Sequence, residues 1–192
     1  PGKEILDKGH RVRITSPKGT ILNLNIADRV ANACPGFCDK PGMLGSPPDI
    51  ETNIAPIEYE SNGILIVDGS IPCKDVGVIK DDIRITVKNG MITEIDTSVL
   101  QGQALKSIFA AQSQNNSKIL AEFGIGLNPK AQLCGRMLED EGCLGTIHFG
   151  FGSNATIGGT NNVNFHLDFV IRNASVWIDD IVLIKNGELL IL

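Results

Sequence analysis

The chain has 192 residues, of which 42% are hydrophobic and 20% charged, and a formal net charge of −5. This length and composition fit a single domain spanning residues 1–192 around one packed core. The acidic balance and scattered Lys and Arg residues exclude nucleic acid as the expected partner, since phosphate binding needs clustered basic side chains.

No apolar stretch of membrane length and no signal peptide is present, so we expect no membrane association. Five cysteines without dense spacing indicate reduced thiols and a cytoplasmic protein. Because the chain begins at Pro1 rather than Met, we expect it to be the C-terminal part of a longer protein.

Short apolar runs separated by turn residues predict strands in the first third of the chain. Residues 2–6 are typical of a helix or a turn, and residues 11–14 and 20–26 flank a Ser-Pro-Lys-Gly turn that predicts a hairpin. Residues 30–50 are rich in Pro, Gly and Cys and predict a long ordered loop. Three further strands are expected at 53–57, 63–67 and 77–79.

Two Asn-Gly pairs lie between apolar runs and predict tight hairpins. Asn89-Gly90 separates residues 83–87 from 91–95, and Asn186-Gly187 separates residues 181–184 from 189–192. Helical spacing of apolar residues predicts an amphipathic helix over 100–114 and a short one over 130–140, with a strand at 119–126. The expected fold is therefore α+β, with a strand-rich, largely antiparallel sheet and two helices packed on it.

His166 and Asp168 lie two residues apart in the apolar run 164–171. Such a run predicts a strand, in which side chains at i and i+2 point to the same face. An imidazole beside a carboxylate is half of a divalent metal site.

Three more ligand-type side chains lie in or beside apolar strands: Glu51, Glu122 and His148. A single histidine in a strand is more often a core residue, and a single glutamate more often faces solvent. A buried carboxylate, however, needs a cation or a partner. We therefore expect a metal site if these strands converge.

The same segments resemble the catalytic half of the aminopeptidase T/S-type metallopeptidases, also called leucyl aminopeptidase-like. The resemblance covers nearly the whole chain and is carried by residues 9–20, 48–56, 120–126, 145–148 and 165–168. It implies a hydrolase that removes N-terminal residues from peptides with a water activated by two ions of Zn, Co or Mn. It also implies a homo-oligomer, and it leaves the catalytic residues unassigned. The implied metal ligands are Glu51, Glu122, His148, His166 and Asp168.

Two alternatives remain open. Residues 145–168 also resemble the related dihydroxypyridine dioxygenases, which implies one Fe(II) held by a set such as His148, His166 and Asp168 and a small aromatic substrate. The segment after His148 lacks the tyrosine that the peptidases carry, because the single tyrosine is Tyr59. The other alternative is a non-catalytic binding module that keeps the fold.

Overall fold

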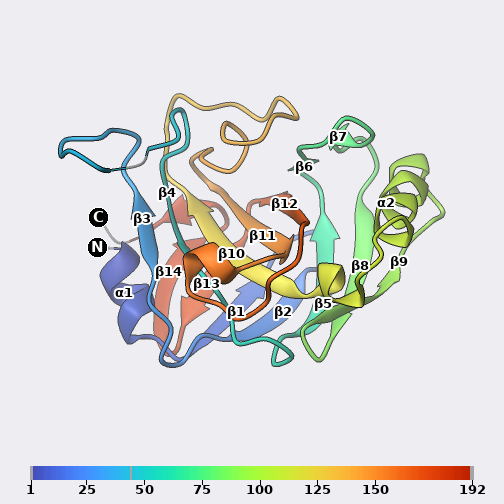
Figure 1. Ribbon diagram of the computed structural model, residues 1–192, viewed down its shortest axis with the longest axis horizontal. Coiled ribbons are helices and arrows are strands. Elements are labelled where there is room, and N and C mark those ends of the chain that lie inside the picture. The colour runs from blue at the N-terminus through green and yellow to red at the C-terminus, as the bar shows by residue number, and fades with distance from the viewer. Residues whose placement is uncertain (1, 44, 191–192) are drawn as a thin grey trace.

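The computed structural model describes residues 2–43 and 45–190 and shows two antiparallel sheets (Figure 1). The eight-stranded sheet has the order β15-β14-β13-β1-β2-β5-β8-β9, and the seven-stranded sheet has the order β3-β4-β10-β11-β12-β6-β7. The predicted strand-rich, antiparallel α+β fold is confirmed, with two sheets in place of one.

The eight-stranded sheet is formed by β1 (Arg11–Thr15), β2 (Ile21–Asn25), β5 (Asn62–Val67), β8 (Ile83–Lys88), β9 (Met91–Ile95), β13 (Ser175–Ile178), β14 (Ile181–Lys185) and β15 (Glu188–Leu189). The seven-stranded sheet is formed by β3 (Asn32–Cys34), β4 (Glu51–Ile54), β6 (Ser70–Ile71), β7 (Gly77–Val78), β10 (Leu120–Gly126), β11 (Thr146–Gly152) and β12 (His166–Arg172). The predicted strand at 53–57 thus begins two residues earlier, and β3 lies within the predicted loop.

Two α-helices and two 3-10 turns complete the described chain: α1 (Gly2–Lys8), α2 (Leu100–Ala110), η1 (Asn115–Lys118) and η2 (Ala155–Ile157). The predicted helix at 100–114 is confirmed as α2, but the prediction of a helix at 130–140 is wrong. There the Asp140 carboxylate accepts the backbone N–H groups of Cys134 at 2.7 Å and Gly135 at 2.9 Å. Leu138 has a φ of 68°, which no right-handed helix accommodates. These local hydrogen bonds replace the helical ones.

Both Asn-Gly hairpins are confirmed by their backbone geometry. Asn89 and Gly90 have φ values of 46° and 68°, and Asn186 and Gly187 have values of 50° and 83°. A type I′ turn needs two consecutive residues with positive φ, which Asn and Gly tolerate best. The last two residues of the predicted strand at 189–192 lie outside the described residues.

Phenylalanine side chains of β10, β11 and β12 fill the core. Phe123, Phe149, Phe151 and Phe169 are fully buried, and the Phe151 and Phe169 rings lie 4.7 Å apart between centroids. Burying each such ring stabilises the fold by about 1.5–3 kcal/mol. Because side chains alternate along a strand, residues 122, 148 and 168, which neighbour these phenylalanines, point to the opposite face.

Candidate metal centre

Glycines lie directly across from the ligand-type side chains of the seven-stranded sheet. Gly124 pairs with His148, and Gly150 pairs with both Glu122 and Asp168. A Cβ atom at position 124 would lie 2.0 Å from His148 Nε2, and one at position 150 would lie 2.6 Å from His166 Nε2. Because glycine has no Cβ atom, positions 124 and 150 leave room for the imidazole rings of His148 and His166.

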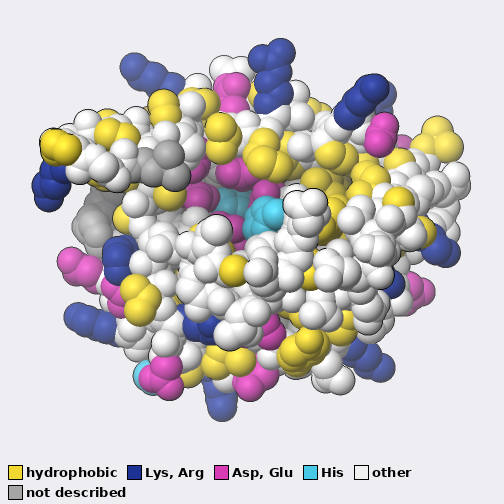
Figure 2. All heavy atoms as spheres, viewed as in Figure 1, with side chains coloured by type: hydrophobic (Ala, Val, Ile, Leu, Met, Phe, Trp, Pro, Cys, Tyr) yellow, Lys and Arg dark blue, Asp and Glu magenta, His cyan; other side chains and the backbone are white. Residues whose placement is uncertain are grey.

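The structure brings all five predicted ligands together. His148 Nε2 lies 3.0 Å from Glu51 Oε2 and 3.7 Å from Glu122 Oε1. His166 Nε2 lies 3.3 Å from Glu122 Oε2 and 3.2 Å from Asp168 Oδ1. Figure 2 shows histidine and acidic side chains at the bottom of a hollow in one face of the molecule. The strands thus converge as the metal hypothesis requires.

Two sets of three residues have ligand atoms within 4.8 Å of one another at this position, and both contain Glu122. One set is Glu51, Glu122 and His148, and the other is Glu122, His166 and Asp168. Neither contains both imidazoles, so the structure places Glu122, rather than His148, with His166 and Asp168. The His166 side chain is 31% exposed and that of His148 is 1% exposed, so the set that contains His166 is the one in contact with solvent.

Hydrogen bonds fix the orientation of His166 more firmly than that of His148. His166 Nδ1 lies 2.8 Å from the Ser153 carbonyl oxygen, which accepts its N–H and leaves Nε2 as the ligand atom of the neutral ring. His148 Nδ1 is buried without a hydrogen-bond partner, and the neighbour of the buried Glu51 Oε2 is His148 Nε2 at 3.0 Å. Such atoms in a group of carboxylates and imidazoles fit a divalent cation.

Charge coupling between these groups shifts their pKa values strongly. Burial would raise the pKa of Glu122, but hydrogen bonds from His148 and His166 lower it to about 2. Burial would lower the pKa of His166, but hydrogen bonds to Asp168 and Glu122 raise it to about 11. Burial would also lower the pKa of His148, but the negative charges of Glu51 and Glu122 outweigh burial and raise it. The imidazolium protons thus offset the carboxylate charge that a metal would otherwise offset.

Three further side chains lie near the centre and were not among the predicted ligands: Cys34, Asp49 and Glu141. Burial raises the pKa of Glu141 to about 9, and the charge of Asp168 adds to the effect. Burial and the charge of Glu51 raise the pKa of Asp49 to about 7. The spacing of two residues between Asp49 and Glu51 could have indicated that both carboxylates lie near the site. Nothing in the acidic run 139–141 distinguishes Glu141 from its two neighbours.

A family model described as 2,5-dihydroxypyridine 5,6-dioxygenase (NicX) matches residues 1–191. The chain belongs to this family. The 2,5-dihydroxypyridine 5,6-dioxygenase of Pseudomonas putida KT2440 is 23% identical over 194 residues, which cover 96% of this chain and 55% of that protein. The chain therefore spans about half the length of the curated relative that it matches.

Solved structures support the same fold. The 2,5-dihydroxypyridine dioxygenase structure from Pseudomonas putida KT2440 superposes with a TM-score of 0.90 at 21% identity, covering 100% of this chain and 58% of that one. AmpT from Thermus thermophilus superposes with a TM-score of 0.75 at 18% identity, covering 97% of this chain and 51% of that one. The chain therefore shares its fold with both the dioxygenase and the AmpT structure.

The prediction of a metallo-aminopeptidase is wrong, and with it the expectation of a hydrolase acting in proteolysis. The family match and the curated relative support the dioxygenase branch, which was the alternative. The error has a physical cause, because histidine and carboxylate side chains in this order serve both kinds of metal chemistry.

Within the described residues, no helix is long and apolar enough to cross a membrane.

Proposed function

We propose that this chain carries the Fe(II) centre of a ring-cleaving dioxygenase, which adds both atoms of O₂ to a dihydroxylated pyridine or a similar aromatic molecule. The observation that carries the proposal is the NicX family match over residues 1–191, in a chain with a buried histidine and carboxylate cluster. The substrate class follows from the activity of the relative in Pseudomonas putida.

We further propose that Glu122, His166 and Asp168 bind the iron. Their ligand atoms lie within 4.8 Å of one another, and imidazole and carboxylate are donors that suit Fe(II). Bound Fe(II) would supply the O₂ chemistry that protein side chains lack. The exposed side of His166 lets an aromatic ring approach this set from the hollow.

The surrounding residues have supporting tasks in this proposal. Ser153 holds the His166 ring through its carbonyl oxygen, so that Nε2 faces Glu122 and Asp168. His148 lies on the other side of Glu122, where its imidazolium pairs with that carboxylate at 3.7 Å and keeps it ionised. Burial of Glu122 and Asp168 excludes water from the protein side of the set.

Oxygen uptake and metal analysis of the full-length protein test the proposal. After anaerobic reconstitution with Fe(II), we expect about one iron per chain and O₂ consumption that matches loss of the ultraviolet absorbance of 2,5-dihydroxypyridine. A fully loaded protein that consumes no O₂ with any dihydroxylated pyridine or related ring would overturn it. Loading with Zn²⁺ in place of iron is the control, since Zn²⁺ has no redox chemistry.

A further inference from the structure

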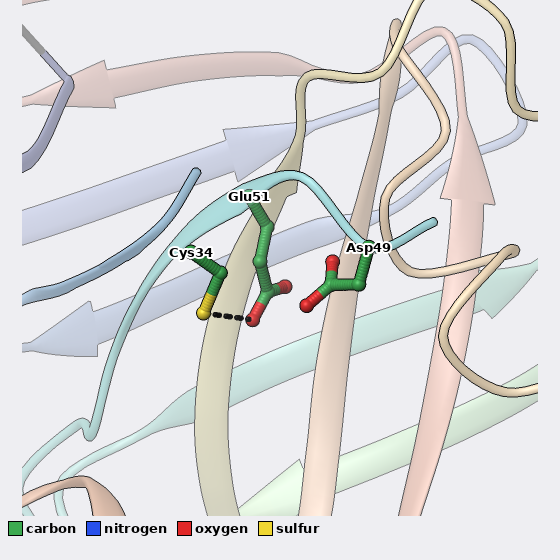
Figure 3. Close-up of side chains that lie close together, drawn as sticks. All are labelled: Cys34, Asp49 and Glu51. Carbon is green, nitrogen blue, oxygen red and sulfur yellow. Dashed lines mark hydrogen bonds between the residues drawn. The ribbon is translucent and has the colours of Figure 1, made fainter. Parts of the chain in front are cut away.

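Cys34, Asp49 and Glu51 form a second cluster beside the metal centre (Figure 3). Cys34 in β3 is the register partner of Glu51 in β4, and directly opposed residues of an antiparallel pair share one face. Asp49 precedes Glu51 by two residues, and its carboxylate points toward that of Glu51 in Figure 3. The sulfur and one oxygen of each carboxylate lie within 4.8 Å of one another.

The carboxylates of this cluster are buried and incompletely satisfied. Asp49 is 3% exposed and Glu51 is 5% exposed. Asp49 Oδ1 has no hydrogen-bond partner, and Asp49 Oδ2 accepts the Ser46 hydroxyl at 3.3 Å. Glu51 Oε1 accepts the Asn53 side-chain amide at 2.5 Å, and Glu51 Oε2 lies 3.0 Å from His148 Nε2. Among the described residues, His148 is the one basic side chain that pairs with either carboxylate, and its partner is Glu51. Asp49 therefore lies buried beside a second acid without a basic partner of its own in the described chain, which favours a positive ligand at this cluster.

We propose that Cys34, Asp49 and Glu51 form a second metal site, which takes a thiophilic divalent cation of the Zn²⁺ type. A thiolate with two carboxylates suits Zn²⁺, and a water completes its four ligands. A tetrahedral Zn²⁺ site places sulfur and oxygen ligands roughly 3.6 Å apart. Cys34 Sγ and Glu51 Oε1 lie 3.8 Å apart, so the site needs little rearrangement.

The site has a structural consequence for the hollow. Cys34 ends β3, and Asp49 lies just before β4, so one ion bound by both closes the connection between these strands. Tying the two ends of a loop together removes conformational freedom from the unfolded chain. The bound ion therefore raises the melting temperature of the protein.

Titration with Cd²⁺ tests the site, because a Cd²⁺–thiolate bond gives an ultraviolet charge-transfer band that carboxylates and imidazoles do not give. We expect the full-length protein to show this band and a higher melting temperature with Cd²⁺ or Zn²⁺, and Cys34→Ser to show neither. Asp49→Asn, which keeps the thiol, should weaken Cd²⁺ binding at least tenfold. Cys38→Ser is the matched control, since its exposed thiol lies in the same connection.

An unchanged band in Cys34→Ser would overturn the proposal, as would a wild-type protein without the band. Equal Cd²⁺ affinity of Asp49→Asn and wild type would also contradict it and leave only a thiol hydrogen-bonded to Glu51. The proposal does not rest on the proposed dioxygenase activity. His166→Ala keeps the predicted Cd²⁺ band while it removes iron binding, so failure of one proposal is distinguishable from failure of the other.

Discussion

Glu58 and Glu122 both have largely buried carboxylates, but the partners of the two carboxylates differ in kind. Glu58 pairs with Arg29 and accepts the side-chain amide of Asn154 at 2.8 Å and the backbone N–H of Thr160 at 2.7 Å. Burial would raise the pKa of Glu58, but these donors and the Arg29 charge lower it to about 2. Glu122 is ion-paired only with the two histidines in the described part of the chain.

Glu58 has the surroundings of a carboxylate that stabilises the fold, and Glu122 has those of a carboxylate that binds a metal ion. The donors around Glu58 are permanent, because a guanidinium and amide groups do not lose their protons near neutral pH. The donors around Glu122 are imidazoles, which become metal ligands when they lose a proton. A buried carboxylate surrounded by imidazoles and other acids is therefore the better indicator of a metal site.

The largest effect that the comparison predicts is loss of iron in Asp168→Ala. This variant removes one of three proposed ligands, so the iron affinity should fall by more than about 100-fold. Loss of a residue that only hydrogen-bonds a ligand typically costs about 10–100-fold. Iron analysis after equilibrium dialysis measures it. His10→Ala is the control, since His10 is an exposed histidine that lies outside the hollow. Equal iron content in both variants would contradict the assignment of Asp168.

Two glycine variants distinguish the imidazoles. In Gly150→Ala the new Cβ lies 2.6 Å from His166 Nε2, and the partly exposed ring can turn toward solvent, which should weaken iron binding about 10–100-fold. In Gly124→Ala the new Cβ lies 2.0 Å from the His148 ring, which is buried and has nowhere to move.

Gly124→Ala should therefore cost about 1–3 kcal/mol of unfolding free energy through overpacking, with little change in iron affinity. Iron titration and urea denaturation of both variants measure these effects. The opposite result, with iron lost in Gly124→Ala alone, would make His148 the ligand.

Glu58→Gln tests the structural side of the comparison. It should lower the unfolding free energy by about 2 kcal/mol, because it replaces a charged acceptor of several hydrogen bonds, and it should leave iron binding unchanged. The pKa of Glu58 is lowered from 4.5, so its stabilisation is present above about pH 4.5 and is lost as the pH falls toward 2.

Wild type and Glu58→Gln should therefore converge in stability in acid. Urea denaturation from pH 7 to pH 3 measures the difference. Glu4→Gln, an exposed change in α1, should alter stability by less than about 0.5 kcal/mol. A constant difference between wild type and Glu58→Gln at all pH values would refute the electrostatic explanation.

Glu51→Ala should have the smallest effect on the reaction. Glu51 belongs to the set with His148 and to the cluster with Cys34, but not to the set with His166 and Asp168. Iron content and ring cleavage should persist in this variant. An iron-free or inactive protein would show that Glu51 belongs to the catalytic centre, as a two-metal site requires.

Local sequence patterns predicted local features well. The spacing of His166 and Asp168 predicted a shared strand face, and β12 places both in one cluster. Both Asn-Gly turns were predictable because only a few residues tolerate positive φ. The helix predicted at 130–140 failed because the Asp140 side chain competes for the backbone N–H groups.

Features that depend on pairing between distant strands were not predictable from one sequence. The approach of Glu51 to His148 depends on the order β4-β10-β11, and no spacing in the chain encodes that order. The cluster of Cys34 with Glu51 depends on β3, which lies in a Pro- and Gly-rich segment without periodicity. The reaction class was also beyond the ligand pattern, because the same side chains bind Zn²⁺ and Fe(II).

An anomalous-scattering map of crystals of the full-length protein, loaded anaerobically with Fe(II), tests the central claim most directly. Data collected on both sides of the iron absorption edge locate and count the iron ions. We expect a single peak bounded by Glu122, His166 and Asp168. A peak between Glu51 and His148, or a pair of peaks that share Glu122, would contradict the account.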